Sequence, residues 1–534
     1  CGTLHSNTTG NCNIAIGKNA LCENTTGCYN TGMGHQALFS SLTGCHNFAA
    51  GQCALYSNSG GHNNTGIGYL ALKCNTTGDY NTAIGYQNLR DNTTGHRNFA
   101  SGENALLSNT TGHYNHAIGA NAMRCNTIGA YNNAIGSDNL RANTEGNYNS
   151  VLGYRSLNCN TTGNCNTAIG YQSLRQNITG SDNFAVGGHS LECNTTGCFN
   201  TAIGNKAMTL SLSGDHNFAA GQCALYTNCG GCCNTAIGKQ ALCANTTGNN
   251  NQAIGPNALY GNTTGSDNQA IGCSALQSNT TGYCNTAIGR MALMSNTTGY
   301  YNIGIGCGAL CDNTEGHDNT SIGYRTLYNN TEGCFNTAIG CQALYENTTG
   351  NYNTSIGVCA LMYNTTGSYN NAIGANAMRC NTTGHHNNAF GGSALQNNTT
   401  GQYNFAGGYQ SLVSNVSGNN NTSIGIYSMY DNIHGCDNTA IGQQTLRNNT
   451  TGNYNTGIGQ WAMHCNTTGH NNTGIGVNTL CGNTTGSCNT ALGDNALKGS
   501  LSGCDNFAAG RRALYNNWGG CYNTGIGCGA LCGN

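Results

Sequence analysis

The chain has 534 residues, including 81 glycines, 33 cysteines and one proline, and charged residues make up only 7% of it, for a formal net charge of -2. This near-neutral balance argues against nucleic acid or an anionic membrane surface as a partner. No run of 18 apolar residues occurs, so we expect no membrane-spanning segment.

A glycine recurs every 17 residues from Gly10 to Gly520, with no insertion. Counted from the Asn of NTTG, the consensus is NTTGxxNTAIGxxALxx over positions 1 to 17, and Asn7 is the first position 1. A short fixed period indicates a solenoid, and the abundant Gly, Asn and Thr disfavour helices. The sequence therefore predicts an all-β, parallel β-solenoid with coils of 17 residues, about 31 coils in number, forming one continuous domain over residues 1–534.

The most constant residues of each coil are Asn at positions 1 and 7 and Gly at positions 4 and 11. We expect all four to form corners, because Gly allows positive φ or close backbone approach and Asn bonds nearby backbone in bends. Stacked Asn side chains can also form amide ladders along the coils.

Strands are expected at positions 7 to 10 and 13 to 16, with a short third side at positions 1 to 3. In six coils a Phe at position 8 coincides with a small residue at position 10, where Ile is usual. Residues two apart share a face of a strand, and a constant summed volume is typical of a packed interior, so we place positions 8 and 10 inside. The six are Phe48, Phe99, Phe184, Phe218, Phe405 and Phe507.

Two further interior rows are expected. Position 15 is always Leu or Met, and position 2 exchanges its Thr for residues such as Leu42 and Ile178. Position 3 instead accepts Glu145 and Glu315, so we expect it to face water.

Position 9 would then point outward, although it holds almost only Ala, Gly or Ser. Its small residues have two explanations: local crowding near a tight corner, or a flat surface against which another chain packs. The candidate packing residues are Ala15, Gly32, Ala83, Ala168 and Ala202.

All cysteines but Cys229 fall at positions 5, 6, 12, 13, 16 and 17. Stacked strands would bring equal positions of neighbouring coils to about 5 Å, a Cα separation that a disulfide permits. We expect disulfides in an oxidising, extracellular setting, with unpaired surface thiols as the alternative. The candidates are Cys1, Cys12, Cys28, Cys45, Cys307, Cys311, Cys504, Cys521, Cys528 and Cys532.

Other chemistry has less support. The NTT runs at Asn7, Asn24, Asn75 and Asn92 match the N-glycosylation signal, although Asn at a corner needs no sugar to explain it. Histidines gather at positions 5 and 6 without the spacing of a zinc site, so we expect no metal and no other cofactor. Tyr and Phe at position 6 either offer platforms for sugars or stabilise the solenoid. No catalytic set is recognisable, and we expect no enzyme.

The runs NTAIGYQ (166–172), ALYENTTG (343–350) and NTTGSYNNAIG (364–374) resemble repeats of bacteriophage tail fibres. The AIG strand is similar to the head repeat of trimeric autotransporter adhesins, whose period is shorter. This resemblance covers the whole chain and implies a left-handed β-roll on a fibre outside a cell or virion, with a trimer as one form of assembly.

The chain begins with CGTLHSN and ends with CGALCGN, which we interpret as the same uncapped half-coil. Uncapped solenoid ends can pair with another chain. We therefore predict a structural subunit of an extracellular filament that assembles with its own copies, end to end or laterally, and is stabilised by disulfides. One alternative is a host-attachment or adhesin fibre that binds surface glycans. Another is an ice-binding solenoid, which needs a flat, outward double rank of Thr. It is disfavoured because the inward placement of position 8 leaves only the rank at position 3, which Glu interrupts.

Overall fold

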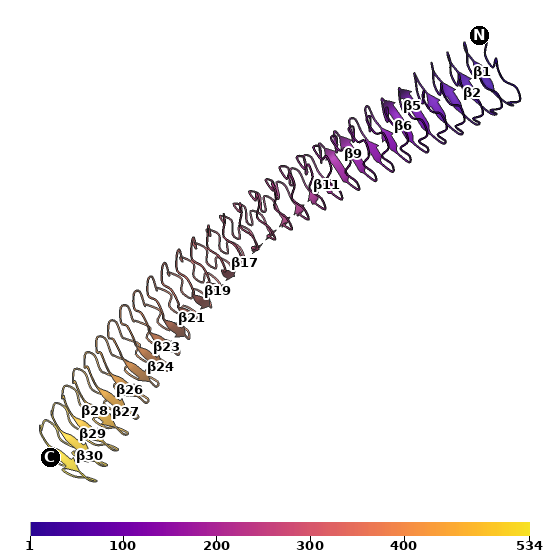
Figure 1. The fold of residues 1–534 in the computed structure, drawn as a ribbon. Coiled ribbons are helices and arrows are strands. Elements are labelled where there is room, and N and C mark those ends of the chain that lie inside the picture. The colour runs from indigo at the N-terminus through magenta and orange to yellow at the C-terminus, as the bar shows by residue number, and fades with distance from the viewer. Residues whose placement is uncertain (1, 534) are drawn as a thin grey trace. The chain divides into compact units, whose positions relative to one another are not determined.

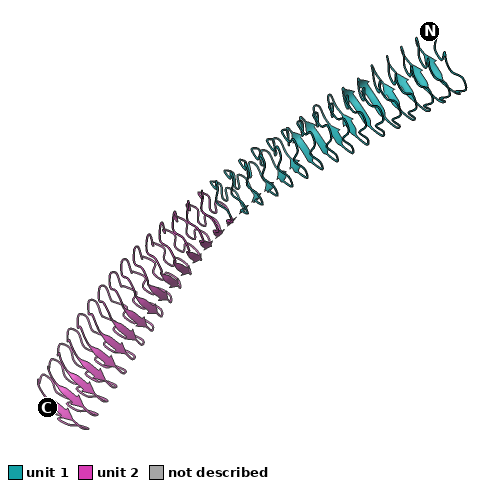
Figure 2. Ribbon diagram, in the orientation of Figure 1, with its two compact units in different colours: residues 1–266 teal, residues 267–534 magenta. Residues whose placement is uncertain are grey.

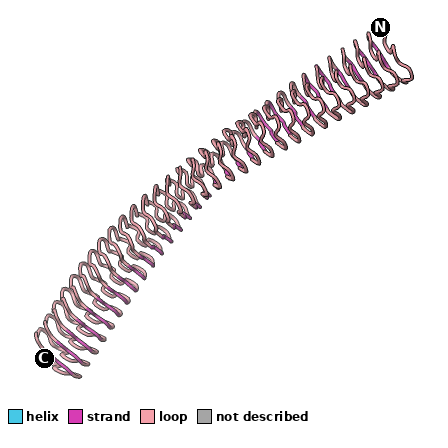
Figure 3. The backbone as a smooth tube through the Cα atoms, in the orientation of Figure 1, coloured by secondary structure: helices cyan, strands magenta, loops and turns pink. Residues whose placement is uncertain are grey.

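A computed structural model describes residues 2–533 as a parallel β-solenoid whose coils repeat every 17 residues (Figure 1). The chain divides into two compact units, Cys1–Ser266 and Asp267–Asn534, coloured separately in Figure 2. Each coil carries one short strand, and turns form the remainder (Figure 3). Residues 2–533 contain no helix, and hence no helix able to cross a membrane. The predicted fold class is confirmed.

The strands of the first unit occupy positions 8 to 10 of their coils, and β5, β6, β9 and β10 extend two residues further. They are β1 (Ile14–Ile16), β2 (Thr31–Met33), β3 (Phe48–Ala50), β4 (Thr65–Ile67), β5 (Thr82–Tyr86), β6 (Phe99–Glu103), β7 (His116–Ile118), β8 (Asn133–Ile135), β9 (Ser150–Tyr154), β10 (Thr167–Tyr171), β11 (Phe184–Val186), β12 (Thr201–Ile203), β13 (Phe218–Ala220), β14 (Thr235–Ile237) and β15 (Gln252–Ile254).

The strands of the second unit have three residues each, at the same positions. They are β16 (Gln269–Ile271), β17 (Thr286–Ile288), β18 (Ile303–Ile305), β19 (Thr320–Ile322), β20 (Thr337–Ile339), β21 (Thr354–Ile356), β22 (Asn371–Ile373), β23 (Asn388–Phe390), β24 (Phe405–Gly407), β25 (Thr422–Ile424), β26 (Thr439–Ile441), β27 (Thr456–Ile458), β28 (Thr473–Ile475), β29 (Thr490–Leu492), β30 (Phe507–Ala509) and β31 (Thr524–Ile526).

Within each unit, neighbouring strands pair in parallel with equal positions opposite each other. In the pairing of β12 with β13, Thr201 lies beside Phe218 and Ile203 beside Ala220. Equal positions of successive coils therefore lie next to one another along the unit, and we call such a set of residues a row. The strands of a unit form one sheet on one side of its coils (Figure 3).

The interior of the coil is narrow and is filled by positions 9, 14 and 15. Ala236 at position 9, Ala241 at position 14 and Leu242 at position 15 are all completely buried. A Cβ built on Gly32 would lie 3.4 Å from Cγ of Leu21 and 3.2 Å from the carbonyl oxygen of Ala37. Position 9 thus faces the leucine row of the preceding coil at van der Waals distance, which leaves room only for Gly, Ala or Ser.

The predicted second strand at positions 13 to 16 is wrong, because these residues form a turn in which positions 14 and 15 both point inward. Position 15 adopts the left-handed region, with φ of 50° at Leu21 and 51° at Met123. That conformation costs about 1–2 kcal/mol for a residue with a side chain. Burying the leucine side chain contributes roughly 2–3 kcal/mol. This gain offsets the backbone cost, so position 15 is Leu or Met although its φ would suit glycine.

Two ladders of buried asparagine amides join the coils, as the sequence predicts. At position 1, the Asn24 Nδ2 donates to Oδ1 of Asn7 at 2.6 Å and to the carbonyl of Gly27 at 3.1 Å. At position 7, the Asn13 Nδ2 donates to the same Gly27 carbonyl at 2.8 Å, and the Asn30 backbone N–H donates to Oδ1 of Asn13 at 2.9 Å. The position-4 carbonyl is therefore satisfied by both ladders.

The two invariant glycines are required for close approach. A Cβ on Gly129 at position 4 would come within 2.5 Å of both Oδ1 of Asn126 and the carbonyl oxygen of Gly146. At position 11, Gly34 has φ of +133°, and its Cβ would lie 2.6 Å from the carbonyl oxygen of Gly51. Neither place admits a side chain.

The position-1 ladder is broken where Ser replaces Asn. The hydroxyls of Ser41, Ser211 and Ser500 have no hydrogen-bond partner. The amide oxygen of the preceding Asn is also unpaired in each case, because the serine cannot donate across the gap. Those oxygens belong to Asn24, Asn194 and Asn483.

Candidate functional site

The outer face of the strands, made by positions 8 and 10, is the most distinctive surface of the coils. We call it the strand face. Ile237 at position 10 is 38% exposed and Phe218 at position 8 is 37% exposed, whereas Ala236 between them is fully buried. The predicted inward placement of positions 8 and 10 is therefore wrong. The volume exchange between them is real, but it takes place on the outside.

The predicted packing interface at position 9 is wrong for the same reason. Gly32, Ala83, Ala168 and Ala202 lie inside the coil, and Ala15 in the first coil is half-buried. The small size of this row reflects the leucine row that it contacts, not a partner chain.

Position 2 also faces outward, so its predicted interior row is wrong. Leu42 is 40% exposed and Trp518 62% exposed. A Thr at position 2, such as Thr93, donates its hydroxyl to the carbonyl of Thr110 in the next coil at 3.0 Å. Position 3 faces water as predicted, with Glu145 exposed.

On the strand face, the ring of Phe405 lies toward the space left at position 10 of its own coil. A Cβ added to Gly407 would lie 3.3 Å from Cε1 of Phe405 in the same coil. Phe390 at position 10 of the neighbouring coil contacts the same ring, with centroids 5.7 Å apart. The Phe405 ring thus occupies the place where a side chain is missing at Gly407, and the Phe390 ring packs beside it.

The strand face carries no Asp, Glu, Lys or Arg in any coil, although the chain has 17 basic and 19 acidic residues. Its position-10 residues are mainly exposed isoleucines such as Ile203, Ile424 and Ile475. Position 8 is mostly Thr, so the face combines an exposed apolar row with an uncharged polar row. A contiguous exposed apolar row is typical of a surface that packs against another molecule.

Disulfides between coils do not form among the described residues, so that prediction is wrong for this part of the chain. Cys1 lies outside the described residues. The free thiols are those of Cys12, Cys28, Cys45, Cys307, Cys311, Cys504, Cys521, Cys528 and Cys532, together with the other described cysteines.

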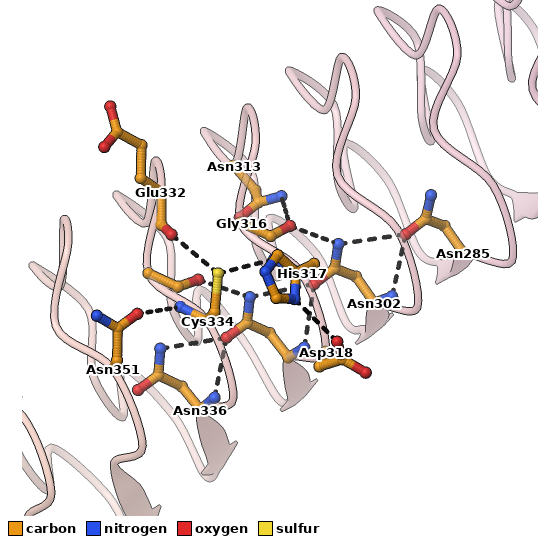
Figure 4. Close-up of polar contacts among 12 residues, drawn as sticks. Asn285, Asn302, Asn313, Gly316, His317, Asp318, Glu332, Cys334, Asn336 and Asn351 are labelled. Atoms are coloured by element: carbon orange, nitrogen blue, oxygen red, sulfur yellow. Dashed lines mark hydrogen bonds and ion pairs between the residues drawn. The ribbon is translucent and has the colours of Figure 1, made fainter.

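Cysteines at position 5 accept and donate hydrogen bonds as unpaired thiols. The sulfur of Cys334 accepts a hydrogen bond from the backbone N–H of His317 at 3.4 Å and donates to the carbonyl of Glu332 at 3.1 Å (Figure 4). The N–H of Cys334 in turn donates to Oδ1 of Asn351 at 2.7 Å. Ser181 makes the same pair of bonds with its hydroxyl, accepting from the N–H of Asn164 at 3.0 Å. The thiol here replaces a hydroxyl or amide in a ladder.

This ladder was missed by the sequence reasoning, although the signal is present. Position 5 is almost restricted to Asn, Cys, His, Asp and Ser, all short side chains able to accept a hydrogen bond. Asp79 and His62 belong to it, since the His62 N–H donates to Asp79 Oδ1 at 2.6 Å. The row varies in residue type but keeps one function.

Cys311 in the CGALC run is buried, and this burial, aided by the nearby Asp312, raises its pKa to about 11. Its contact with Tyr328 raises the pKa of that phenol to about 12. Cys307 of the same run is exposed. The two sulfurs thus occupy different environments and form no bond.

The predicted glycosylation sites are inaccessible in the folded coils, apart from Asn7. Asn24, Asn75 and Asn92 are completely buried, and their Nδ2 atoms donate within the position-1 ladder. Asn7 is exposed, and its Nδ2 donates to the carbonyl of Gly10. A glycan on Nδ2 of the buried residues would remove these bonds and could not fit.

The aromatic residues at position 6 stack face to face along the coils. The longest row runs from Phe335 through Tyr352, Tyr369 and His386 to Tyr403, with centroids 4.8 to 4.9 Å apart. Sugars stack on ring faces, and here most faces are covered by the next ring. The geometry favours stabilisation of the solenoid over a glycan platform.

No group of three or more His, Cys, Asp or Glu residues is arranged to hold a metal ion within residues 2–533. The fold defines the chain as a tandem-repeat β-solenoid protein. A comparison with models of known protein families finds no match, and a comparison with curated proteins finds none either. The resemblance to tail-fibre and adhesin-head repeats stays a prediction.

Proposed function

We propose that the protein is a structural subunit of an extracellular fibre and that its copies associate laterally through the strand face. The observation that carries this proposal is the volume exchange between positions 8 and 10 on an outward face. A solvated surface has no need to keep summed volume constant, whereas a packed interface does. The resemblance to fibre repeats supports an extracellular location.

The area of the face suits a stable contact. Fifteen strands of three residues, as in the first unit, present about 700 Å², taking roughly 3.3 Å per residue and 4.8 Å between strands. A typical specific interface buries about 800 Å² per partner. One unit is thus close to sufficient, and the second unit adds a face of similar size.

A second copy is the partner that fits this face best. Rows on any other copy have the same spacing between coils, and neither face carries Asp, Glu, Lys or Arg, so none of these charges is left unpaired on contact. End-to-end assembly by the backbone bonds that join successive coils is compatible with lateral contact. Surface glycans as partners lack a built site on the stacked rings.

Sedimentation velocity tests the proposal with paired variants in two adjacent coils. Ile458→Lys with Ile475→Lys places two charges on the strand face, while Thr451→Lys with Thr468→Lys places them on the exposed position 3 of the same coils. We expect the wild type and the position-3 variant to sediment as multimers and the strand-face variant as monomers. A monomeric wild type, or equal behaviour of both variants, contradicts lateral association through this face.

Ice binding is a second candidate, because the argument against it depended on an inward position 8. Thr422, Thr439, Thr456, Thr473 and Thr490 instead form an outward row of the strand face. The parallel row at position 10 is Ile or Leu, so only one of the two ranks is Thr. A freezing-point measurement decides: thermal hysteresis with shaped ice crystals supports this function, and its absence removes it.

A further inference from the structure

The six phenylalanine coils specify how two strand faces would meet, an inference that rests on the lateral association proposed above. We propose that a second copy of the chain packs parallel and in register, related by a two-fold axis that runs along the rows. Such an axis lies between the two faces and exchanges their two rows. Position 8 of each copy then lies opposite position 10 of the same coil in its partner.

This arrangement matches large residues with small ones. Phe218 of one copy faces Ala220 of the other, and the reverse contact occurs at the same level. In ordinary coils Thr faces Ile, as for Thr235 and Ile237. An antiparallel pair would place position 8 of one copy against position 8 of the other. Large residues would then not be matched with small ones from coil to coil.

The spacing of the phenylalanines excludes shifted registers. In the first unit, Phe48, Phe99, Phe184 and Phe218 are separated by 51, 85 and 34 residues, which are 3, 5 and 2 coils of 17. No separation between any two of these coils occurs twice, so a sliding shift matches at most one of them. Each remaining Phe would face an Ile of the partner, and that contact would be overpacked. Each small residue at position 10 of a phenylalanine coil would face a Thr of the partner, and that contact would leave a gap. Phe405 and Phe507, 11 and 6 coils further along the sequence, extend the same non-repeating series.

Mixing two complementary variants tests this contact. One copy carries Ala220→Ile and the other Phe218→Thr. In the proposed pair, the Phe218 that remains in the first copy meets Ala220 of the second. The isoleucine introduced into the first copy meets the threonine introduced into the second, so both contacts are restored. Pairs of identical variants contain either two overpacked contacts or two gaps.

Native mass spectrometry of the mixture, with one copy isotope-labelled, gives the proportions of the three pairs. We expect the ratio of mixed pairs to identical pairs to exceed its statistical value by roughly tenfold, the factor that about 1.4 kcal/mol produces. A matched control mixes Ala220→Ile with Phe184→Thr, two coils away, and should show no preference.

The outcomes separate the two proposals. Statistical proportions from associating copies overturn the in-register, two-fold arrangement and leave lateral association standing. That result would also follow if the ring of Phe218 compensates only for Ala220 of its own chain. Monomers of the wild type overturn both.

Discussion

At the scale of the residue, the buried asparagine amides form a specific link between coils. Where Asn follows Asn at position 1, the amide bonds to the previous amide and to its own coil's glycine carbonyl, as Asn245 does with Asn228 and Gly248. A buried polar atom left without a partner costs about 1–3 kcal/mol. The three serine coils therefore mark weak points in the ladder.

Replacing one of these serines should repair the ladder. Ser211→Asn supplies the amide that the unpaired Asn194 oxygen lacks, and we expect it to raise the free energy of unfolding by about 1–2 kcal/mol. Urea denaturation measures the change. The reverse variant Asn245→Ser, in the same unit, should lower stability by a similar amount, and a stabilising Asn245→Ser would contradict the ladder's role.

The thiol of Cys311 should react slowly with alkylating reagents in the folded protein. Its pKa of about 11, against an ordinary value of 9.0, leaves roughly 100-fold less thiolate near pH 8. Because folding raises this pKa, the neutral thiol's contribution to stability is present below pH 9 and is lost as the pH rises from 9 toward 11. Peptide mapping after timed alkylation measures the rate, with exposed Cys307 as the internal reference; equal rates would argue against burial of Cys311.

At the scale of the element, the single strand of each coil has a small residue inside and two larger residues outside. The exchange of volume between positions 8 and 10 correctly places them on one face, but spacing by two residues does not reveal which face. The decisive signal was the constant small size of position 9, which the leucine row requires. The adjacent inward residues at positions 14 and 15 likewise indicate a turn, since neighbours in a strand point to opposite sides.

Paired substitutions in one strand test this orientation. Ala236→Leu forces a larger side chain against the leucine row, and we expect it to destabilise the protein by about 1–3 kcal/mol or to prevent folding. Ile237→Thr lies on the outside and should change the unfolding free energy of the monomer by less than about 1 kcal/mol. Thermal unfolding at low protein concentration measures both, and a larger loss from Ile237→Thr would contradict the orientation.

At the scale of the whole molecule, the period, the parallel solenoid and the corner roles of Asn and Gly follow from the sequence alone. They follow because the constraints repeat in every coil. The free state of the cysteines and the burial of the glycosylation signals could not be predicted in the same way. The hydrogen bonds that a sulfur at position 5 or an amide at position 1 makes depend on residues in the adjacent coils. Cys334 and Asn75 show this, each being committed to a ladder.

Folding should protect the buried glycosylation signals. We expect a purified oligosaccharyltransferase to modify the urea-unfolded chain at Asn75 and Asn92 and to leave both unmodified once the chain is folded, because their Nδ2 atoms are buried and bonded. Glycopeptide mass spectrometry of the two samples compares occupancy. Modification of these residues in folded protein would show that the ladder opens.

The central claim is that positions 8 and 10 form an outward face that a second copy covers. Electron cryo-microscopy of the assembled protein, at a resolution that shows side chains, tests it most directly. We predict two solenoids with their strand faces in contact, Phe218 against Ala220 of the other copy, and Ala236 inside its own coil. Isolated solenoids, or contacts made through another side of the coil while Ile237 stays exposed to solvent, would contradict the claim.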